Sequence, residues 1–346
     1  MCIETSKQRT RGSSPTASCP QPAPESLHRT VALWFSANAR DLPWRRADCS
    51  AWGVLVSEVM LQQTPVVRVL PVWQEWLARW PTPAALAGES SGEAVRAWGR
   101  LGYPRRALRL HAAAVAITTV HDGEVPDSYE HLLGLPGVGT YTAAAVAVFA
   151  FNRRETVVDT NIRRVHARLF AGQALPAPAL TRMETKLAED LLPEDGRLSV
   201  SWNAGVMELG ALLCTARSPK CGQCPVRDAC AWRAAGEPPP TYIPKGQPWA
   251  GTDRQVRGAV MAVLRTAQAP VERAVFLGET TDIPCVDGAD CKPLPEVDCV
   301  HIRPLRTLLD RLRSLNAEES QLERALDGLL RDGLAQSVGT GIRLPA

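Results

Sequence analysis

The chain of 346 residues is long enough for two or three domains, and its 45% hydrophobic and 22% charged residues are typical of a globular protein. No apolar run reaches the roughly 18 residues that a membrane-spanning helix needs, and the N-terminal stretch lacks the apolar core of a signal peptide. The composition therefore excludes a membrane protein, and we expect a cytoplasmic protein that does not contact a membrane.

The net charge of +3 is unevenly distributed along the chain. Residues 28–235 contain 23 Lys or Arg against 19 Asp or Glu, whereas residues 236–346 contain 13 against 15. An excess of positive charge marks the part of a protein that meets a polyanion. The larger, N-terminal part is thus the candidate for such a contact.

Composition and periodicity divide the first two thirds of the chain into three segments. Residues 1–26 are rich in Ser, Thr and Pro and are predicted to form a disordered tail. Residues 27–235 carry apolar residues at helical spacing almost throughout, and no convincing run of alternating strands interrupts them. Residues 236–250 contain several prolines and are predicted to be a linker. An all-α domain followed by a linker is therefore expected.

Residues 251–346 are predicted to form a small C-terminal module. Helical patterns cover 254–265 and 317–334, and residues 335–344 have the pattern of a short hairpin. A helix followed by a β-hairpin indicates a winged-helix-like module. The irregular stretch between the helices carries three cysteines, which are either unpaired thiols in a loop or a second metal site: Cys285, Cys291 and Cys299.

Glu58 lies in a predicted helix that is otherwise almost free of charge, residues 50–61. A carboxylate among apolar side chains resists ionisation, so its pKa should be raised, as a general acid requires. The alternative is an ordinary helical glutamate that faces solvent or pairs with an arginine. The helix ends in a polar turn whose Thr64-Pro65 pair predicts the cap of a following helix. The glutamines of this turn are either plain loop residues or, in a protein that enters a duplex, replacements for an extruded base.

Residues 127–151 have the pattern of a helix, a tight turn and a second helix, with the turn at Leu135-Pro-Gly-Val-Gly139. Glycine tolerates the backbone angles that let N–H groups point outward, and the N-terminus of the next helix adds its positive dipole end. These features predict a corner that binds phosphate without reading sequence, through the backbone of Gly137, Val138 and Gly139. The alternative is a plain connector between two packed helices.

Asp159 follows a short apolar pair and precedes a helix with apolar residues at helical spacing. The simplest interpretation is an N-cap aspartate. Capping would also fix the carboxylate and keep it ionised, so Asp159 could stabilise a cationic sugar intermediate.

Four cysteines fall within 17 residues in the pattern C-x6-C-x2-C-x5-C: Cys214, Cys221, Cys224 and Cys230. Thiolates at this density can close on one metal centre, either zinc or an iron–sulfur cluster, and the spacing alone does not separate the two. A pair of disulfides is the competing interpretation, although intracellular thiols stay reduced.

The motifs LPGVGTYTA at 135–143 and VVDTNIRRV at 157–165, together with the cysteine array, resemble the helix–hairpin–helix DNA glycosylases of the endonuclease III superfamily. SEVMLQQT at 57–64 is similar to the adenine DNA glycosylase (MutY) branch. The resemblance covers about residues 28–235. It implies two all-α lobes with the active site between them and a [4Fe-4S] cluster on the four cysteines.

The resemblance also implies roles for individual residues. Glu58 would protonate adenine, Asp159 would support the oxocarbenium-like sugar, and Tyr141 and Asn161 would position or assist these groups. The residues expected to contact DNA, with Leu61 and Gln63 as wedge and Tyr103 as helper, are Leu61, Gln62, Gln63, Thr64, Tyr103, Gly137, Val138 and Gly139. The substrate would be double-stranded DNA with adenine opposite 8-oxoguanine or guanine. Residues 249–346 do not match the Nudix-like domain with which such enzymes read 8-oxoguanine.

Tyr141 stands where lyase-competent relatives have a lysine, and no lysine lies between Lys7 and Lys186. A phenol cannot form the imine through which strand cleavage proceeds. We therefore expect a monofunctional, monomeric glycosylase, associated with the nucleoid in a bacterial cell. The alternatives are an endonuclease III-like glycosylase and lyase for oxidised pyrimidines, and a non-catalytic iron–sulfur DNA-binding protein.

Overall fold

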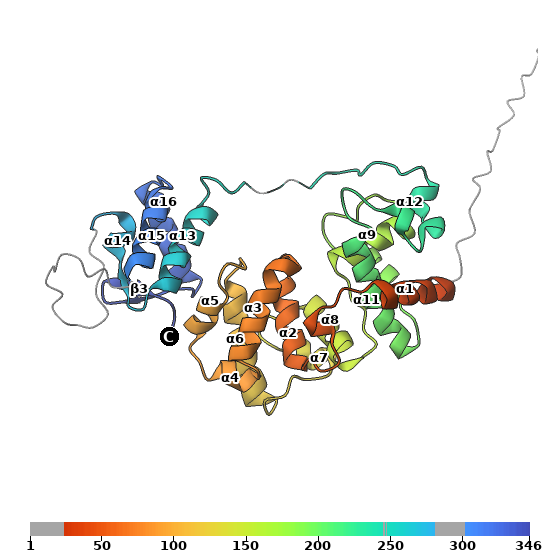
Figure 1. Cartoon of the computed structure of the whole chain (residues 1–346), viewed down its shortest axis with the longest axis horizontal. Coiled ribbons are helices and arrows are strands. Elements are labelled where there is room, and N and C mark those ends of the chain that lie inside the picture. Colours follow the sequence, from red (N-terminus) through yellow and green to blue (C-terminus); the bar gives the residue numbers. More distant parts are fainter. Residues whose placement is uncertain (1–23, 245, 247, 281–301) are drawn as a thin grey trace, which may run out of the picture.

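The computed structural model describes residues 24–244, 246, 248–280 and 302–346. Most of the predicted tail and Cys285, Cys291 and Cys299 lie outside the described residues. The described chain is mainly helical, as predicted, and forms two helical lobes and a C-terminal module (Figure 1). None of its helices is long and apolar enough to cross a membrane.

The first lobe is formed by consecutive helices around a core rich in tryptophan. Six tryptophans are buried in it, and such large side chains contribute most of the apolar area that a core removes from water. The buried tryptophans are Trp44, Trp52, Trp73, Trp76, Trp80 and Trp98. The elements are η1 (Pro43–Arg45), α2 (Ala51–Leu61), α3 (Val66–Arg79), α4 (Pro83–Ala87), α5 (Ser91–Ala97), α6 (Arg105–Val120), α7 (Tyr129–Leu133) and α8 (Thr140–Phe151).

The second lobe combines the N-terminal helix with helices that follow α8. Helix α1 begins at Pro24, three residues inside the predicted tail, and packs along α11. The core of this lobe contains Trp202 and the apolar face of α9. The elements are α1 (Pro24–Asn38), α9 (Thr160–Leu169), α10 (Arg182–Asp190), α11 (Gly196–Leu212), η2 (Cys221–Gln223), η3 (Arg227–Ala229) and α12 (Ala231–Ala234).

A buried carboxylate ties α11 to the segment that connects the two lobes. Glu208 has a fully buried side chain and pairs with Arg40 at 2.6 Å and with Arg45 at 2.9 Å. Although burial opposes ionisation, the hydrogen bonds from both guanidinium groups lower the pKa of Glu208 to about 2. The segment between α1 and α2 is therefore fixed to α11, which sets how the lobes face each other.

The C-terminal module contains helices and a small antiparallel sheet of strand order β1-β3-β2. Ile342 of β3 is opposite Val271 on one side and Ser337 on the other. The predicted helices and hairpin are present, and their winged-helix-like assignment stays a prediction. The elements are α13 (Asp253–Thr266), β1 (Val271–Glu272), α14 (Arg273–Leu277), α15 (Ile302–Arg313), α16 (Glu319–Arg331), β2 (Gln336–Val338) and β3 (Gly341–Arg343).

The module packs against the first lobe and shares a continuous apolar core with it. Arg265 donates a hydrogen bond to the carbonyl of Val95 at 3.0 Å, and Arg96 donates to the carbonyl of Ala267 at 3.2 Å. Burial in this interface lowers the pKa of Arg265 to about 10. The chain thus passes from α12 in the second lobe to α13 at the opposite end of the molecule (Figure 1).

Candidate active site and cluster loop

Helix α2 carries Glu58 into the interior. Ser50 caps the helix, and every residue from Trp52 to Met60 is buried, with Glu58 only 6% exposed. The hydroxyl of Tyr141 donates a hydrogen bond to Glu58 Oε2 at 2.8 Å. Burial raises the pKa of Glu58 to about 7, while the hydrogen bond from Tyr141 and the charge of Arg45 oppose this rise. The alternative of a solvent-facing glutamate is therefore wrong.

Asp159 caps α9, as its sequence context predicted. Its Oδ1 accepts a hydrogen bond from the backbone N–H of Ile162 at 2.6 Å, and its Oδ2 accepts one from the amide of Asn161 at 2.8 Å. Burial raises the pKa of Asp159, although these hydrogen bonds and the charge of Arg164 act in the opposite direction. The net direction is upward, so capping does not by itself hold the pKa of this carboxylate low.

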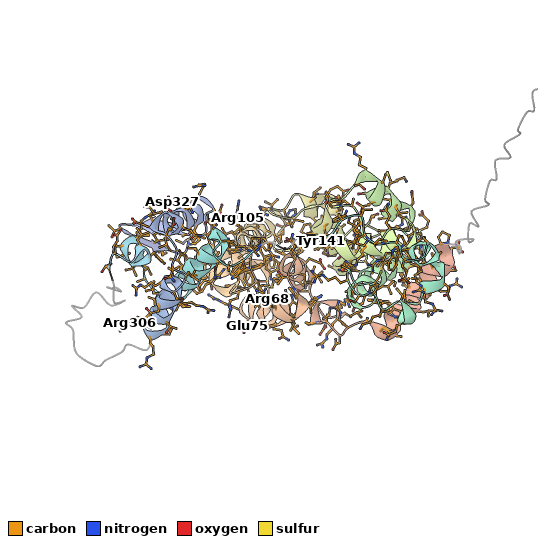
Figure 2. The ribbon with its side chains drawn as sticks, turned by 90° about the horizontal axis from the view of Figure 1, so that it is seen from above. Arg68, Glu75, Arg105, Tyr141, Arg306 and Asp327 are labelled. Carbon is orange, nitrogen blue, oxygen red and sulfur yellow. The ribbon has the colours of Figure 1, made fainter. Side chains whose placement is uncertain are left out.

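The carboxyl groups of Glu58 and Asp159 and the hydroxyl of Tyr141 interact electrostatically where the lobes meet. Burial raises the pKa of the Tyr141 hydroxyl well above its usual value, and the negative charges of Glu58 and Asp159 raise it further. Asp159 also raises the pKa of Glu58. Tyr141 lies at the junction between the lobes (Figure 2). Three residues far apart in the sequence are thus brought into one electrostatically coupled group.

The turn after α2 is held in shape by Arg106, a buried residue of α6 that the sequence did not single out. Its guanidinium donates hydrogen bonds to the carbonyls of Val59 at 3.0 Å and Gln62 at 2.5 Å, and to Thr64 Oγ1 at 3.1 Å. Helix α2 ends in carbonyls that lack partners within the helix, and Arg106 supplies donors for them. The signal in the sequence was that Arg106 lies at the start of a helix of mainly apolar residues, 105–120.

The predicted DNA-contacting residues of this turn differ in their surroundings. Gln63 is exposed and has a φ of 53°, whereas Leu61 is half-buried. Gln62 donates a hydrogen bond to Thr142 Oγ1 at 3.1 Å. Thr64 is buried and supports the turn, and it does not cap α3, whose N-cap is Pro65. Gln63 is therefore the residue of this turn most available to an external partner.

The turn between α7 and α8 has the tight geometry expected of it. Gly137 has a φ of 76°, and a Cβ built on it would lie 2.5 Å from the Cβ of Arg109, so only glycine fits there. Gly139 is the N-cap of α8. Val138 has a buried side chain, and its N–H donates to the carbonyl of Leu135 at 3.1 Å. The N–H group of Val138, one of the three that were predicted to bind phosphate, thus already donates a hydrogen bond within the turn.

The four cysteines lie in the loop that follows α11. All four are free thiols, so the disulfide alternative is wrong. The pKa values of Cys224 and Cys230 are raised by burial and by the charges of the other cysteines, which places the four sulfurs in one group. Four thiolates in one loop are a donor set that fits a [4Fe-4S] cluster.

Two arginines of α9 connect this loop to the carboxylate site. Arg168 lies over the ring of Trp232 and donates to Cys214 Sγ at 3.3 Å. Arg164 donates to the carbonyl of Cys214 at 2.7 Å and to Asn161 Oδ1 at 2.7 Å. Since Asn161 holds Asp159, Arg164 bridges the cluster loop and the capping carboxylate. Sequence reasoning missed both arginines, whose signal was their four-residue spacing on an amphipathic helix, which places them on one face.

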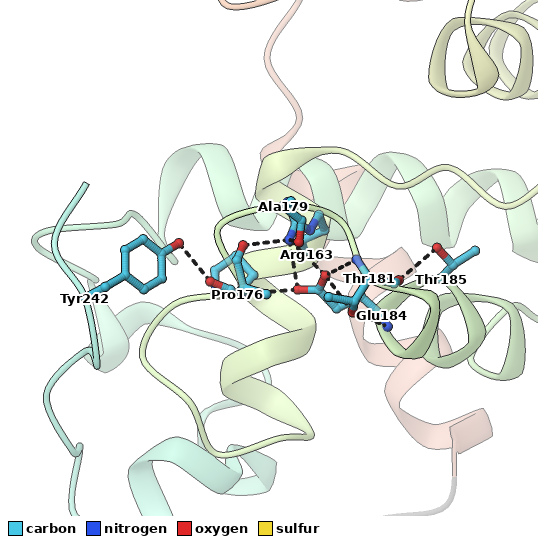
Figure 3. Close-up of polar contacts among 8 residues, drawn as sticks. Arg163, Pro176, Ala179, Thr181, Glu184, Thr185 and Tyr242 are labelled. Carbon is cyan, nitrogen blue, oxygen red and sulfur yellow. Dashed lines mark hydrogen bonds and ion pairs between the residues drawn. The ribbon is translucent and has the colours of Figure 1, made fainter. Parts of the chain in front are cut away.

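The start of the linker is also attached to the second lobe. Tyr242 donates a hydrogen bond to the carbonyl of Pro176 at 2.9 Å (Figure 3). The loop that contains Pro176 is held by Arg163, which donates to the carbonyls of Ala177 and Ala179 and pairs with Glu184 at 2.8 Å. The linker thus leaves the second lobe from a fixed position.

The helical lobes, the tight interhelical turn and the cysteine loop define a class of protein. Residues 56–190 match the profile of the HhH-GPD superfamily base excision DNA repair proteins, and residues 214–230 match the iron-sulfur binding domain of endonuclease III. The fold is similar to that of a thermostable thymine-DNA glycosylase, with a TM-score of 0.55 and 27% identity over 61% of this chain and 97% of that one.

Two relatives are similar over most of their own length. The adenine DNA glycosylase of Mycolicibacterium smegmatis is 46% identical over 308 residues, which cover 89% of this chain and 92% of the relative. That of Mycobacterium tuberculosis is 51% identical over 261 residues, or 74% of this chain and 85% of the relative. The chain belongs to the adenine DNA glycosylase family. Its four cysteines, Cys214, Cys221, Cys224 and Cys230, are the ligands that would hold a [4Fe-4S] cluster.

Proposed function

We propose that the protein is a monofunctional glycosylase that hydrolyses the N-glycosidic bond of adenine mispaired with 8-oxoguanine or guanine in double-stranded DNA. The observation that carries the proposal is the pair of Glu58 and Asp159, whose carboxyl groups interact electrostatically with each other and with Tyr141. A protonated acid and an anion on either side of a glycosidic bond are the requirements for its hydrolysis. The shared name of the relatives supports adenine as the base.

The first step is extrusion of the adenine from the duplex, because neither carboxyl group can reach a base that remains stacked. Gln63 and Leu61, at the end of α2, would fill the space that the base leaves. The backbone N–H groups of Gly137 and Gly139 and the dipole of α8 would hold the phosphate backbone. These contacts do not depend on the base sequence, so they suit an enzyme that searches along DNA.

The protonated form of Glu58 would donate its proton to a ring nitrogen of the adenine. The carbon–nitrogen bond then breaks, its electron pair stays with the neutral adenine, and the sugar becomes a cation. The carboxylate of Asp159 would stabilise that cation until a water molecule adds to it, and the proton that the water loses would return to the carboxylate of Glu58. Asn161 holds Asp159 in place, and Tyr141 holds Glu58. The cluster would support the fold of the cysteine loop, since four thiolates leave no open ligand position for substrate.

Strand cleavage is not expected to follow. A lyase reaction needs an amine that forms an imine with the opened sugar, and the residue next to Glu58 is a phenol, Tyr141. The product would therefore be an intact strand with an abasic site. A reaction on chromosomal DNA would bring the protein, as a monomer, to the nucleoid of a bacterial cell.

The test is to incubate the protein with a duplex that has adenine opposite 8-oxoguanine or guanine and to separate the strands with and without alkali. We expect adenine release with both mispairs and strand breaks only after alkali, whereas adenine opposite thymine should remain intact. Breaks of equal yield without alkali would contradict the monofunctional assignment. Release of an oxidised pyrimidine instead of adenine would favour the endonuclease III-like alternative. A protein that binds the duplex without releasing any base would be the non-catalytic alternative.

A further inference from the structure

An arginine of α6 lies against the turn between α7 and α8. The stem of Arg109 packs on Gly137, since a Cβ built on this glycine would lie within 2.9 Å of the Cβ, Cγ and Cδ atoms of Arg109. Both residues also line a small cavity with Gln62 and Arg106, between this turn and the turn after α2. Arg109 is exposed even though Gly137 covers its stem, so its guanidinium is the part that reaches solvent.

In the described part of the chain, the guanidinium of Arg109 makes no hydrogen bond or ion pair. The preceding arginines of α6 differ from it in this respect. Arg105 pairs with Asp332 at 3.4 Å, and Arg106 donates to the carbonyls of the turn after α2. Neither residues 105–120 nor residues 133–143 contain an acid. The helix and the turn therefore supply no carboxylate that would compete with an external anion for Arg109.

The turn by itself carries too little positive charge to balance a phosphate. The N–H group of Val138 already donates to the carbonyl of Leu135, which leaves the N–H groups of Gly137 and Gly139 for an external anion. The N-terminal dipole of a helix such as α8 is equivalent to about half a positive charge, whereas a phosphodiester carries a full negative charge. Arg109 places a formal positive charge beside the turn, and a guanidinium can donate two parallel hydrogen bonds to a phosphate.

The same turn lies close to the candidate site. Gly139 caps α8, and Tyr141, two residues further on, donates a hydrogen bond to Glu58. Gln62 of the turn after α2 donates to Thr142 Oγ1 at 3.1 Å, so this bond joins the turn after α2 to the first turn of α8. A nucleotide whose base reaches Glu58 would therefore bring its flanking phosphates to the N-terminus of α8.

We propose that Arg109 binds a backbone phosphate of the strand that carries the adenine and, with the N–H groups of Gly137 and Gly139, holds that strand while the base is out of the duplex. The inference rests on the proposed function, because it needs an extruded adenine. The ligand is a phosphodiester and not a base, so Arg109 adds affinity without adding sequence preference. Arg109 is thus a positioning residue, and its loss should weaken binding and leave the chemical step to Glu58 and Asp159.

The experiment compares full-length proteins that differ at Arg109. Arg109→Met keeps a stem that packs on Gly137 and removes the charge, whereas Arg109→Lys keeps both. Arg331→Ala removes an exposed arginine of α16 and is the control. Cluster absorbance and thermal unfolding confirm that each variant is folded. Affinity is measured from low to high salt on a duplex with 2′-fluoro-substituted deoxyadenosine opposite 8-oxoguanine, because the fluorine destabilises the sugar cation and the base then stays attached.

We expect Arg109→Met to bind this duplex roughly 10-fold more weakly than the wild type, the lower end for one hydrogen bond to a charged group. The slope of log affinity against log salt should fall by about one, because one phosphate contact fewer releases about one counterion fewer. Arg109→Lys should keep the slope, and Arg331→Ala should keep both affinity and slope. At saturating protein, single-turnover adenine release from the hydrolysable duplex should be the same for Arg109→Met as for the wild type.

Methylphosphonate substitutions, which replace one charged phosphate by a neutral group, identify the phosphate. At one position near the adenine, the wild type should lose affinity while Arg109→Met loses none further. Wild-type affinity in Arg109→Met, a lower affinity with an unchanged salt slope, or equal losses for the two proteins at every position would each overturn the proposal. If the wild type binds the duplex but releases no adenine from the hydrolysable one, the proposed function fails, and the salt slope and the methylphosphonates still decide whether Arg109 binds DNA.

Discussion

Each lobe contributes one carboxyl group to the candidate site, but the surroundings of the two groups differ. In the first lobe, Glu58 sits in a helix of apolar residues and accepts one hydrogen bond, from Tyr141. In the second lobe, Asp159 accepts hydrogen bonds from a backbone N–H and from Asn161, which is itself held by Arg164. Burial raises the pKa of both groups, whereas more hydrogen bonds stabilise the ionised form of Asp159 than that of Glu58.

This difference teaches that burial alone does not assign an acid and an anion. Two groups whose pKa is raised by burial can hold different protonation states when more donors surround one of them. The apolar lobe favours a proton on Glu58, and the polar N-terminus of α9 favours charge on Asp159. Each of the following substitutions changes one of the two carboxyl groups or its surroundings.

The largest effect is expected from Glu58→Gln, which keeps the shape of the side chain but removes its acidic proton. Single-turnover release of adenine should fall by about 10³-fold, within the range for loss of a general acid. Because the pKa of Glu58 is raised to about 7 in the fold, the stability linked to its protonation is present below the ordinary pKa of 4.5 and is lost as the pH rises toward 7. The variant should thus gain up to about 3 kcal/mol over wild type at pH 8.

Urea unfolding of Glu58→Gln and of the wild type at pH 5 and pH 8 tests the predicted change in stability. The stability difference between the two proteins should be larger at pH 8. An equal difference at both values would mean that Glu58 is ionised without penalty.

Asp159→Asn should remove the anion and keep the cap. We expect adenine release to fall by about 10²- to 10³-fold, as for other losses of a charge-stabilising group. The free energy of unfolding should change by less than about 1 kcal/mol, because asparagine caps helices as well as aspartate does. Asp159→Ala is the matched control and should lose about 1 kcal/mol more than Asp159→Asn. Full activity in Asp159→Asn would show that the second lobe contributes no charge to the reaction.

Arg164→Ala should weaken the hydrogen bonding around Asp159 indirectly, through Asn161. It leaves Asn161 Oδ1 and the carbonyls of Gly210 and Cys214 without their donor, at a cost of about 1 to 3 kcal/mol in unfolding free energy. We expect about 10-fold slower adenine release, because a carboxylate that is no longer held is less often in position, and a lower iron content per protein. Arg197→Ala, an exposed change on α11, is the control. Unchanged iron content and rate would contradict the bridging role of Arg164.

The smallest effect is expected from Tyr141→Phe. The wild-type rate should fall as the pH rises above about 7, because only protonated Glu58 acts as an acid. The hydrogen bond from Tyr141 lowers the pKa of Glu58, so its loss should move this decline to higher pH, by up to about one pH unit. The pH profile of single-turnover release is the measurement. A decline that moved to lower pH would mean that the hydroxyl does not stabilise the ionised form.

Much of the site could be predicted because its signals are local. The cap at Asp159, the tight turn at Gly137 and the spacing of the four cysteines each depend on a few neighbouring residues. The unusual pKa of Glu58 was predictable because a single charge in an apolar helix has to be buried. The expectation that capping would keep Asp159 ionised did not include the burial that raises the pKa of this carboxyl group, because the sequence did not show how deeply it lies.

What the sequence determined by itself was therefore the helices, the ends of several of them and the residue types that carry the chemistry. Only the tertiary structure decided that Tyr141 meets Glu58 across 83 residues of sequence, that Arg106 and Arg164 hold the two halves of the site, and that Arg254 reaches Tyr103. Hydrophobic spacing specifies which face of a helix is buried, but the partner of a buried polar group depends on how the helices pack. The long side chains of arginine allow many partners, and packing selects one of them.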